Sequence, residues 1–308
     1  MTTTGTTSFN LNVNDLIEEA FERCGKELRT GYDFKTARRS LNLLTIEWAN
    51  RGINLWTVEQ GQIPLATGQG LYALPVDTID LLDHVVRQNN GGPNQIDINI
   101  SRIAEPTYIS IPNKLTQGRP IQVWVNRQSG QENLTAATLN GSINNNVTTI
   151  TLNSTAGLAT SGFIKIDNET IGYMNIEGNQ LINCARGQNN TIAASHLSGA
   201  AITVQNLPAI NIWPTPNSPG DQYTFVYYRL RRMQDAGTGT KDQDIPFRFI
   251  PCMVAGLAYH LSVKLPDVAP DRIMMLKASY EELFQQAADE DREKAPVRWV
   301  PRNTNYYR

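Results

Sequence analysis

Residues 33–52 read DFKTARRSLNLLTIEWANRG and carry the pattern that decides how the chain folds. Apolar side chains recur there at spacings of three and four positions, which places them on one side of a helix: Phe34, Ala37, Leu41, Leu44 and Trp48. Asp33 is expected to cap the helix and Gly52 to end it after about 18 residues, roughly 27 Å. A helix with such a stripe needs an apolar partner, so this stretch predicts packing against other helices.

Three further segments can supply that partner. Residues 14–25 predict a short helix that Asn14 caps and Gly25 ends. Residues 247–264 are apolar nearly all round, as in a buried helix, and Pro270 suits the first turn of another helix. That last helix has a stripe of its own, formed by Ile273, Leu276, Tyr280, Leu283 and Ala287. Because these helices lie at both ends of the chain, the sequence predicts one helical subdomain closed by distant segments.

The middle of the chain is rich in short strand-like segments punctuated by glycine and proline. Within it, residues 133–205 differ in composition: Asn, Thr, Ser, Gly and Ile dominate, as in a small β-sandwich or barrel. The only charged side chains there are Lys165, Asp167, Glu169, Glu177 and Arg186. We interpret this stretch as a module inserted into the surrounding β-domain.

The predicted fold class is therefore α+β. A helical bundle subdomain is formed by the N-terminal helices of residues 1–52 and the C-terminal helices of residues 245–295. An antiparallel β-domain comprises residues 53–132 and 206–236, with the inserted β-module at 133–205 and an extended C-terminal tail at 296–308.

Composition restricts the function classes. The chain has 308 residues, 18% charged side chains and a formal net charge of −2, so no global basic field would draw it onto nucleic acid. Cys24, Cys184 and Cys252 are odd in number and far apart, which favours free thiols in a reducing compartment. No signal peptide and no apolar run of about 18 residues occurs, so no membrane contact is expected.

Candidate catalytic residues are sparse. His84, His196 and His260 are isolated in the sequence, and His260 is expected to be a core or interface histidine with one hydrogen bond. The spacings of metal-binding motifs, phosphate-binding loops and nucleophile elbows are missing, and residues 237–241 (GTGTK) are interpreted as a linker.

Two carboxylate pairs are the nearest candidates for the paired acids of a glycosidase, Asp80 with Asp83 and Asp167 with Glu169. The second pair is expected to be solvated turn residues. The sequence thus predicts no catalytic, cofactor-binding or metal-binding residue, no cofactor, and a protein that is not an enzyme.

The C-terminal tail combines arginines with aromatic side chains, namely Arg298, Trp299, Arg302, Tyr306, Tyr307 and Arg308. Such residues can stack on bases or pair with phosphates, and they also dominate protein interfaces. Plain disorder is a third interpretation. The sparse overall charge favours anchoring on a protein.

Several short stretches occur in a specific order along the chain: ARRSLNLLTIEWANRGINLW at 37–56, LYALP at 71–75, IDLLD at 79–83, NKLTQGRP at 113–120, INIWPTP at 210–216, DIPFR at 244–248 and LAYHL at 257–261. In this order they resemble the podoviral head-to-tail adaptor family, also called packaged-DNA stabilisation or tail tubular proteins. The resemblance covers most of residues 10–130 and 206–295.

The resemblance implies a structural virion protein of a short-tailed phage, located at the head–tail junction and assembled in the host bacterial cytoplasm. Its partners would be further copies in a dodecameric ring, the portal protein, and tail nozzle or tail fibre and spike proteins. Genomic DNA would pass through the ring without specific binding during ejection. The six tail residues then become expected portal-interface residues, in a C-terminal extension that reaches onto the portal.

Residues 133–205 depart from that family and are similar to a small β-module found in phage tail proteins. In that module Arg186, Gly187 and His196 are most simply turn and packing residues. An alternative function is therefore a glycan-binding or cell-wall-acting tail protein, which needs exposed aromatic side chains; the module holds only Phe163 and Tyr173. A third alternative, a soluble enzyme domain, would need a pocket with paired catalytic groups.

Overall fold

A computed structural model describes residues 3–7, 9–128, 130–217 and 223–292. The fold is mixed α+β with mostly antiparallel sheets, which confirms the predicted class at that level. The chain divides into two compact units, one drawn from residues 1–57 and 233–308 and the other from residues 58–232. We call them the helical unit and the β unit.

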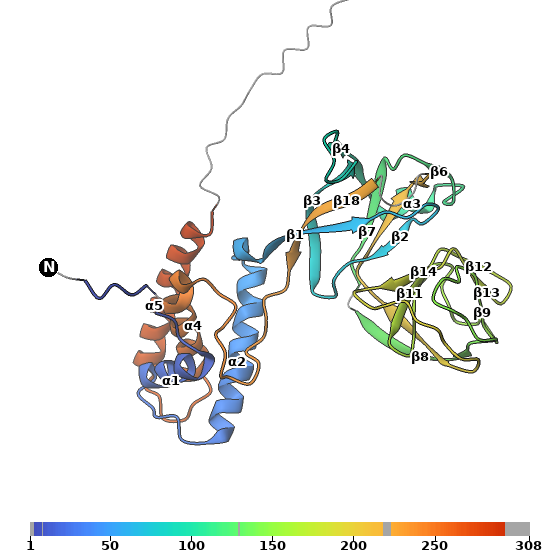
Figure 1. Cartoon of the computed structure of the whole chain (residues 1–308). Coiled ribbons are helices and arrows are strands. Elements are labelled where there is room, and N and C mark those ends of the chain that lie inside the picture. Colours follow the sequence, from blue (N-terminus) through green and yellow to red (C-terminus); the bar gives the residue numbers. More distant parts are fainter. Residues whose placement is uncertain (1–2, 8, 129, 218–222, 293–308) are drawn as a thin grey trace, which may run out of the picture. The chain divides into compact units, whose positions relative to one another are not determined.

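The helical unit contains α1 (Val13–Arg23), α2 (Gly31–Asn50), α4 (Ile250–Ser262) and α5 (Pro270–Glu290), with single 3-10 turns at η1 (Leu55–Thr57) and η2 (Phe247–Phe249). Figure 1 shows α4 and α5 running beside each other, with α1 lying across them. No described helix combines the length and the apolar character that crossing a membrane requires.

Both predicted N-caps are wrong by two or three positions. The cap of α1 is Asn12, whose side chain accepts from the Asp15 amide at 3.0 Å, and not Asn14. The cap of α2 is Thr30. Asp33 instead occupies the third helical position, where its carboxylate accepts from the Thr30 amide while Thr30 Oγ1 accepts from the Asp33 amide. Such a capping box satisfies two otherwise unpaired donors, so the helix begins at Gly31.

One further predicted element differs from the structure. The helix predicted over 247–264 splits into η2 and α4, because Pro251 fits only the first turn of an α-helix. The first strand, β1, begins at Val58, directly after η1. In η1, Trp56 donates from its indole nitrogen to the Asp244 carbonyl at 2.9 Å, which holds this turn within the helical unit.

The four long helices share one hydrophobic core. Leu44 and Trp48 of α2 are buried in it together with Tyr280 of α5, and Trp48 Nε1 donates to Tyr280 Oη at 3.2 Å. Gly256 of α4 lies where the helices approach most closely, since a Cβ there would come within 2.8 Å of Tyr280 and 3.0 Å of Leu44. Segments more than 200 positions apart are thus packed together.

The β unit contains two four-stranded sheets outside the module. The first has the order β1 (Val58–Pro64), β18 (Tyr223–Arg231), β3 (Thr78–Gln88), β4 (Ile96–Asn99). The second has the order β2 (Leu71–Ala73), β16 (Ala209–Trp213), β7 (Gln122–Asn126), β5 (Ser101–Ile103). Side chains of both sheets, including Val86, Phe225, Val123 and Ile212, form one core, so the sheets face each other.

The connections between these strands add short elements. The short helix α3 (Glu105–Ile109) follows β5, and β6 (Gln117–Gly118) pairs with β17 (Thr215–Pro216). The pairs β5–β7 and β6–β17 are parallel, so the β-domain is not wholly antiparallel as predicted.

Residues 131–206 form two further sheets with a core of their own. One has the order β14 (Ala185–Gln188), β11 (Glu169–Tyr173), β10 (Gly162–Ile166), β15 (Ala201–Asn206), β8 (Gln131–Thr138), and the other β12 (Asn175–Glu177), β13 (Gln180–Ile182), β9 (Ile150–Thr151). The chain enters and leaves these two sheets at neighbouring points, because Gln131 of β8 pairs with Asn206 of β15. A small cluster that includes Leu71, Phe163 and Met174 packs these strands against β2 and β16.

Candidate functional site: a buried glutamate cluster

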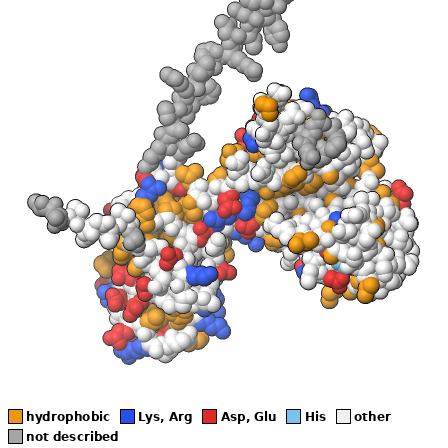
Figure 2. Space-filling model, in the orientation of Figure 1, with side chains coloured by type: hydrophobic (Ala, Val, Ile, Leu, Met, Phe, Trp, Pro, Cys, Tyr) orange, Lys and Arg blue, Asp and Glu red, His pale blue; other side chains and the backbone are white. Residues whose placement is uncertain are grey.

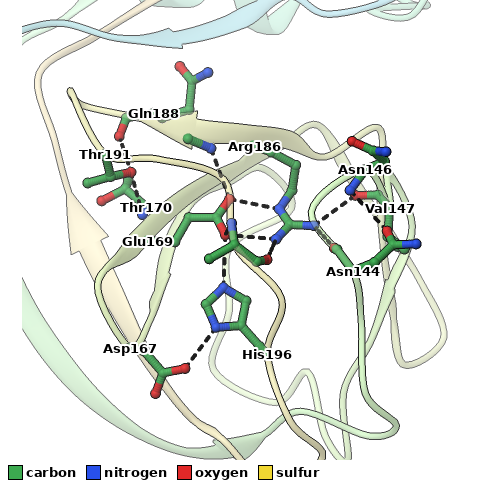
Figure 3. Close-up of polar contacts among 12 residues, drawn as sticks. Asn144, Asn146, Val147, Asp167, Glu169, Thr170, Arg186, Gln188, Thr191 and His196 are labelled. Carbon is green, nitrogen blue, oxygen red and sulfur yellow. Dashed lines mark hydrogen bonds and ion pairs between the residues drawn. The ribbon is translucent and has the colours of Figure 1, made fainter.

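A buried group of ionisable side chains in the β unit surrounds Glu169 (Figure 3). The hairpin between β10 and β11 turns through Asp167 and Asn168, with Ile166 paired to Glu169. Asp167 adopts a left-handed conformation with φ of 52°, which Asp tolerates better than most residues. Alternate strand residues point to the same face, so Glu169 lies on the side of Ile171 and Tyr173, which are core residues.

The carboxylate of Glu169 receives five hydrogen bonds. Oε1 accepts from Arg186 Nε at 2.8 Å and from the Gly187 amide at 2.9 Å. Oε2 accepts from Arg186 Nη2 at 2.7 Å and from the Ala194 amide at 2.9 Å, and it lies 2.8 Å from His196 Nε2. Glu169 is only 1% exposed, so its charge is neutralised by these partners and not by water.

Arg186 extends the cluster to the surrounding loops. Its Nη1 donates to the Asn144 carbonyl at 2.6 Å, and its Nη2 donates to the Ala194 carbonyl at 2.6 Å. His196 Nδ1 lies 2.8 Å from Asp167 Oδ2, and the His196 backbone pairs with Ile143 through two hydrogen bonds of 3.0 Å. One carboxylate thus fixes β11, β14 and two loops.

Burial alone would raise the pKa of Glu169, but the hydrogen bonds from Arg186, the Ala194 amide, His196 and the Gly187 amide outweigh it and lower that pKa to about 2. The carboxylate is therefore ionised throughout the physiological pH range.

The structure corrects two expectations about this group. Asp167 is exposed as expected of a turn residue, but Glu169 is buried and paired. Although His196 is isolated in the sequence, both of its ring nitrogens face carboxylate oxygens in the folded chain. The description of Arg186 and His196 as packing residues is incomplete, because both are polar partners of Glu169.

A histidine beside a carboxylate is a frequent component of catalytic sites. In this cluster, however, the side chains of Glu169 and His196 are 1% and 2% exposed, and every Glu169 oxygen already has its partners. A general base must reach the proton that it abstracts. The geometry therefore favours a structural role for Glu169 and His196 over a catalytic one.

The other candidate residues are separate from this cluster. His260 lies in α4, with Nε2 at 3.1 Å from Glu47 Oε2, in agreement with one polar contact. His84 stacks on Phe225, with its Nε2 buried and without a hydrogen-bond partner in the structure. Burial lowers the pKa of His84, because the charged imidazolium is the form that loses hydration.

A pocket of about 130 Å³ lies beside His84, and Asp83 and Asp97 also line it. Asp97 is held by Arg87 through hydrogen bonds of 2.7 and 2.9 Å. Asp80, the partner of Asp83 in the first carboxylate pair, is likewise bound by Arg102 at 2.7 Å. Asp97 and Asp80 are thus engaged in ion pairs.

The three cysteines are unpaired and buried. Burial raises the pKa of Cys24 to about 11 and those of Cys184 and Cys252 to about 12, so the thiols stay protonated at neutral pH. Within the described ranges, no group of three or more His, Cys, Asp and Glu side chains is arranged to hold a metal ion.

The residues predicted for the portal interface lie outside the described residues: Arg298, Trp299, Arg302, Tyr306, Tyr307 and Arg308. The structure does not test them, and they stay a prediction. The sequence matches no protein-family model and no curated protein, so the function is argued from the chain itself.

Proposed function

We propose that this chain is a structural virion protein, the head-to-tail adaptor subunit of a short-tailed phage. In this proposal, copies of the chain form a homo-oligomeric ring between the portal and the tail nozzle or tail fibre and spike proteins. The ring closes the filled head and conducts genomic DNA without gripping it. Twelve copies are what the family resemblance implies.

The observation that carries the proposal is the way in which the chain builds its two units. Residues at both chain ends make up the helical unit, and residues 58–232 form the β unit as one continuous segment. A subunit built in this way can present a helical surface to one partner and a β surface to another. An adaptor needs two such surfaces.

The stretches that resemble the adaptor family also support the proposal. Residues 37–56 run through α2 into η1, residues 71–75 include β2, and residues 210–216 include most of β16 and all of β17. Residues 257–261 lie within α4. The resemblance therefore involves the elements that form the cores of both units.

The finer fold is part of the same proposal. We infer a bundle of α1, α2, α4 and α5, supported by their common hydrophobic core. We also infer that residues 133–205 are an insertion, supported by their separate core and by the adjacent strands β8 and β15 at which they begin and end. The proposed portal-binding tail, residues 296–308, follows α5 of the helical unit.

The charge of the chain suits a conduit. Contacts with phosphates give strong, salt-dependent attraction to DNA, which would hinder its passage. A formal net charge of −2 avoids such attraction.

The glycan-binding alternative has less support. Carbohydrate recognition would require exposed aromatic side chains on the module, whereas Phe163 and Tyr173 are 4% and 1% exposed. A cell-wall enzyme would release products from peptidoglycan. Reproducible lysis by pure protein, abolished by Glu169→Gln or Asp167→Asn, would overturn the structural function in favour of an enzyme.

Native mass spectrometry of the purified chain, with and without the portal protein of the same phage, tests the proposal. We expect a defined complex of several copies of the chain on the portal oligomer. A chain that stays free of the portal over a range of ionic strengths would contradict the adaptor function.

A further inference from the structure

The helical unit carries a groove between α1 and α4, with a volume of about 510 Å³. Its wall on α1 carries four acids and one base, and its floor on α4 is apolar: Asp15, Glu18, Glu19, Glu22 and Arg23 face Ile250, Pro251 and Val254. Phe9 also lines it and is one of the most exposed large apolar side chains of the described residues. We call this the acidic groove.

The acidic wall follows from the sequence of α1. Leu16, Ile17 and Ala20 point into the core, which leaves the acids on the opposite face at spacings of three and four residues. Glu19 pairs with Arg23 at 3.0 Å. Glu18 and Glu22 are exposed and form no ion pair with any described residue.

A second hollow, of about 430 Å³, lies along the first half of α2. It is lined by Lys35, Arg38 and Arg39 together with Phe34 and Asn42, and we call it the basic face. Lys35 and Arg39 are exposed and form no ion pair with any described residue. The Nε of Arg38 is buried and lacks a hydrogen-bond partner among the described residues. An unpaired buried donor costs free energy unless a binding partner supplies an acceptor.

Exposed apolar side chains lie beside these cations on α2. Tyr32, Leu43 and Ile46 are each more than half exposed, and with Lys35 and Arg39 they follow a helical spacing. The α2 surface therefore combines positive charge with apolar area, as the acidic groove combines negative charge with apolar area. The two surfaces are complementary in both respects.

Both surfaces belong to the same unit but to different helices. Each of α1 and α2 packs on α4, and Figure 2 shows acidic side chains gathered over α1 and basic ones beside the lower part of α2. The two surfaces have no lining residue in common, so they are separate patches of one chain that a second copy can bring together.

We propose that the acidic groove of one copy binds the basic face of a second copy. This inference rests on the proposed function, because it names the surfaces through which the ring would close. Two different patches on one chain make a head-to-tail contact, which gives a ring when the rotation from one copy to the next closes. The buried apolar side chains provide stability, and the opposed charges fix the register.

Charge reversal in the full-length chain tests the pairing. The first variant is Glu18→Lys with Glu22→Lys, and the second is Lys35→Glu with Arg39→Glu. Each variant alone sets like charges against each other, so we expect its self-association in sedimentation velocity to weaken roughly tenfold or more. An equimolar mixture restores opposite charges at every contact, provided that the two variants alternate, and should recover assembly.

The matched control is Lys277→Glu with Glu282→Lys, two exposed reversals on α5 that leave both surfaces unchanged. The control should assemble as the wild-type chain does. Far-UV circular dichroism checks that every variant is folded. Assembly of the wild-type chain should also weaken as salt rises, since exposed charges are screened within about 8 Å at physiological ionic strength.

Several results would overturn the pairing: a wild-type chain that stays monomeric at low salt, single variants that assemble normally, or folded variants whose mixture does not recover. Loss of assembly only on deleting residues 296–308 would identify the tail as the occupant of the groove instead. Portal binding by the variants separates the two proposals. If it persists while the pairing fails, the adaptor function stands without this interface.

Discussion

The stability of the module depends strongly on the side chain of Glu169. It begins β11 on the core-facing side, and its carboxylate receives donors from β14 and from the loop before His196. The pairing with Arg186 is buried, with side-chain exposures of 1% and 7%. Removal of one partner from a buried pair leaves the other charge without compensation.

Glu169→Gln should therefore destabilise the β unit by about 3–5 kcal/mol, because Arg186 keeps its charge and loses its counter-ion. The control is Asp167→Asn at the other end of His196, where the carboxylate is exposed and the expected change is below about 1 kcal/mol. Urea unfolding followed by circular dichroism measures both. Equal effects of the two substitutions would mean that burial of Glu169 does not determine its contribution.

The same carboxylate makes stability depend on pH. The pKa of Glu169 is lowered from 4.5 to about 2, so the unfolded chain binds its proton at a higher pH than the folded chain does. The contribution, about 3 kcal/mol for such a shift, is present above pH 4.5 and is lost as pH falls towards 2. Denaturation curves recorded between these two pH values should show that the free energy of unfolding falls more steeply with decreasing pH for the wild-type chain than for Glu169→Gln.

The partners of Glu169 were only partly predictable. The module has few charges, and a charge that is buried there must be paired, which points to Arg186 as a partner. The alternation of Glu169 with Ile171 and Tyr173 also indicates an inward side chain. The sequence does not reveal that the loop carrying His196 folds back over this strand, because that contact depends on tertiary packing.

At the scale of elements, the apolar stripes predicted the helices better than the capping residues did. The stripe from Phe34 to Trp48 is buried, apart from the partly exposed Phe34, because its spacing matches the helical repeat. Asp33 was misassigned as a cap, since Asp suits both the cap and the third position of a capping box. Only the backbone conformation of Thr30 distinguishes them.

Two neighbouring leucines on α2 test the core of the helical unit. Leu44 is fully buried against Gly256 of α4, whereas Leu43 is 52% exposed. Leu44→Ala should cost about 2–5 kcal/mol through lost contacts and a cavity, and Leu43→Ala about 0.5 kcal/mol or less. Chemical unfolding measures both. A loss below about 0.5 kcal/mol for Leu44→Ala would remove this residue from the core.

Replacement of residues 133–205 with a short Gly/Ser linker tests whether the module is an insertion. The ends to be joined are already neighbours, because the Gly130 amide donates to the Asn206 carbonyl at 2.7 Å. We expect the helical circular-dichroism signal and ring formation to persist. Some loss of stability is expected, since Phe163 and Met174 no longer cover Leu71.

A second variant separates an integral module from an exposed patch. Leu71→Thr in the shortened chain would reduce the apolar surface that the deletion uncovers, and it should restore solubility if exposure is the only defect. An unfolded product in both backgrounds would mean that the module is part of the β-domain core.

At the scale of the whole molecule, the two chain ends determine what the helical unit can bind. The N-terminal segment brings Phe9 to the acidic groove, and α5 leads towards the C-terminal tail. The sequence predicted that distant helices pack together, because each stripe needed a partner. In the proposed ring, the contact of that unit with a neighbouring copy depends on two oppositely charged surfaces, whose residues are brought together only by folding.

Deletion of residues 296–308 tests the proposed portal anchor. The tail carries three arginines, Trp299, Tyr306 and Tyr307, which are residue types that dominate interface energies. One tail offers few contacts, but the tails of a ring engage together, and linked sites gain strongly from effective concentration. The shortened chain should therefore keep its fold and self-association but lose portal binding disproportionately, by roughly 10²-fold or more.

Co-purification with the portal, quantified against wild type, provides the measurement. The control replaces Arg298, Arg302 and Arg308 with Lys, which keeps the charge and removes the planar guanidinium groups that pair with carboxylates through two hydrogen bonds. Weakening in this control would assign the arginines a specific pairing role, and unchanged binding would assign the aromatic side chains most of the energy. If the shortened chain co-purifies at the wild-type ratio, the portal contact must lie on the helical unit itself.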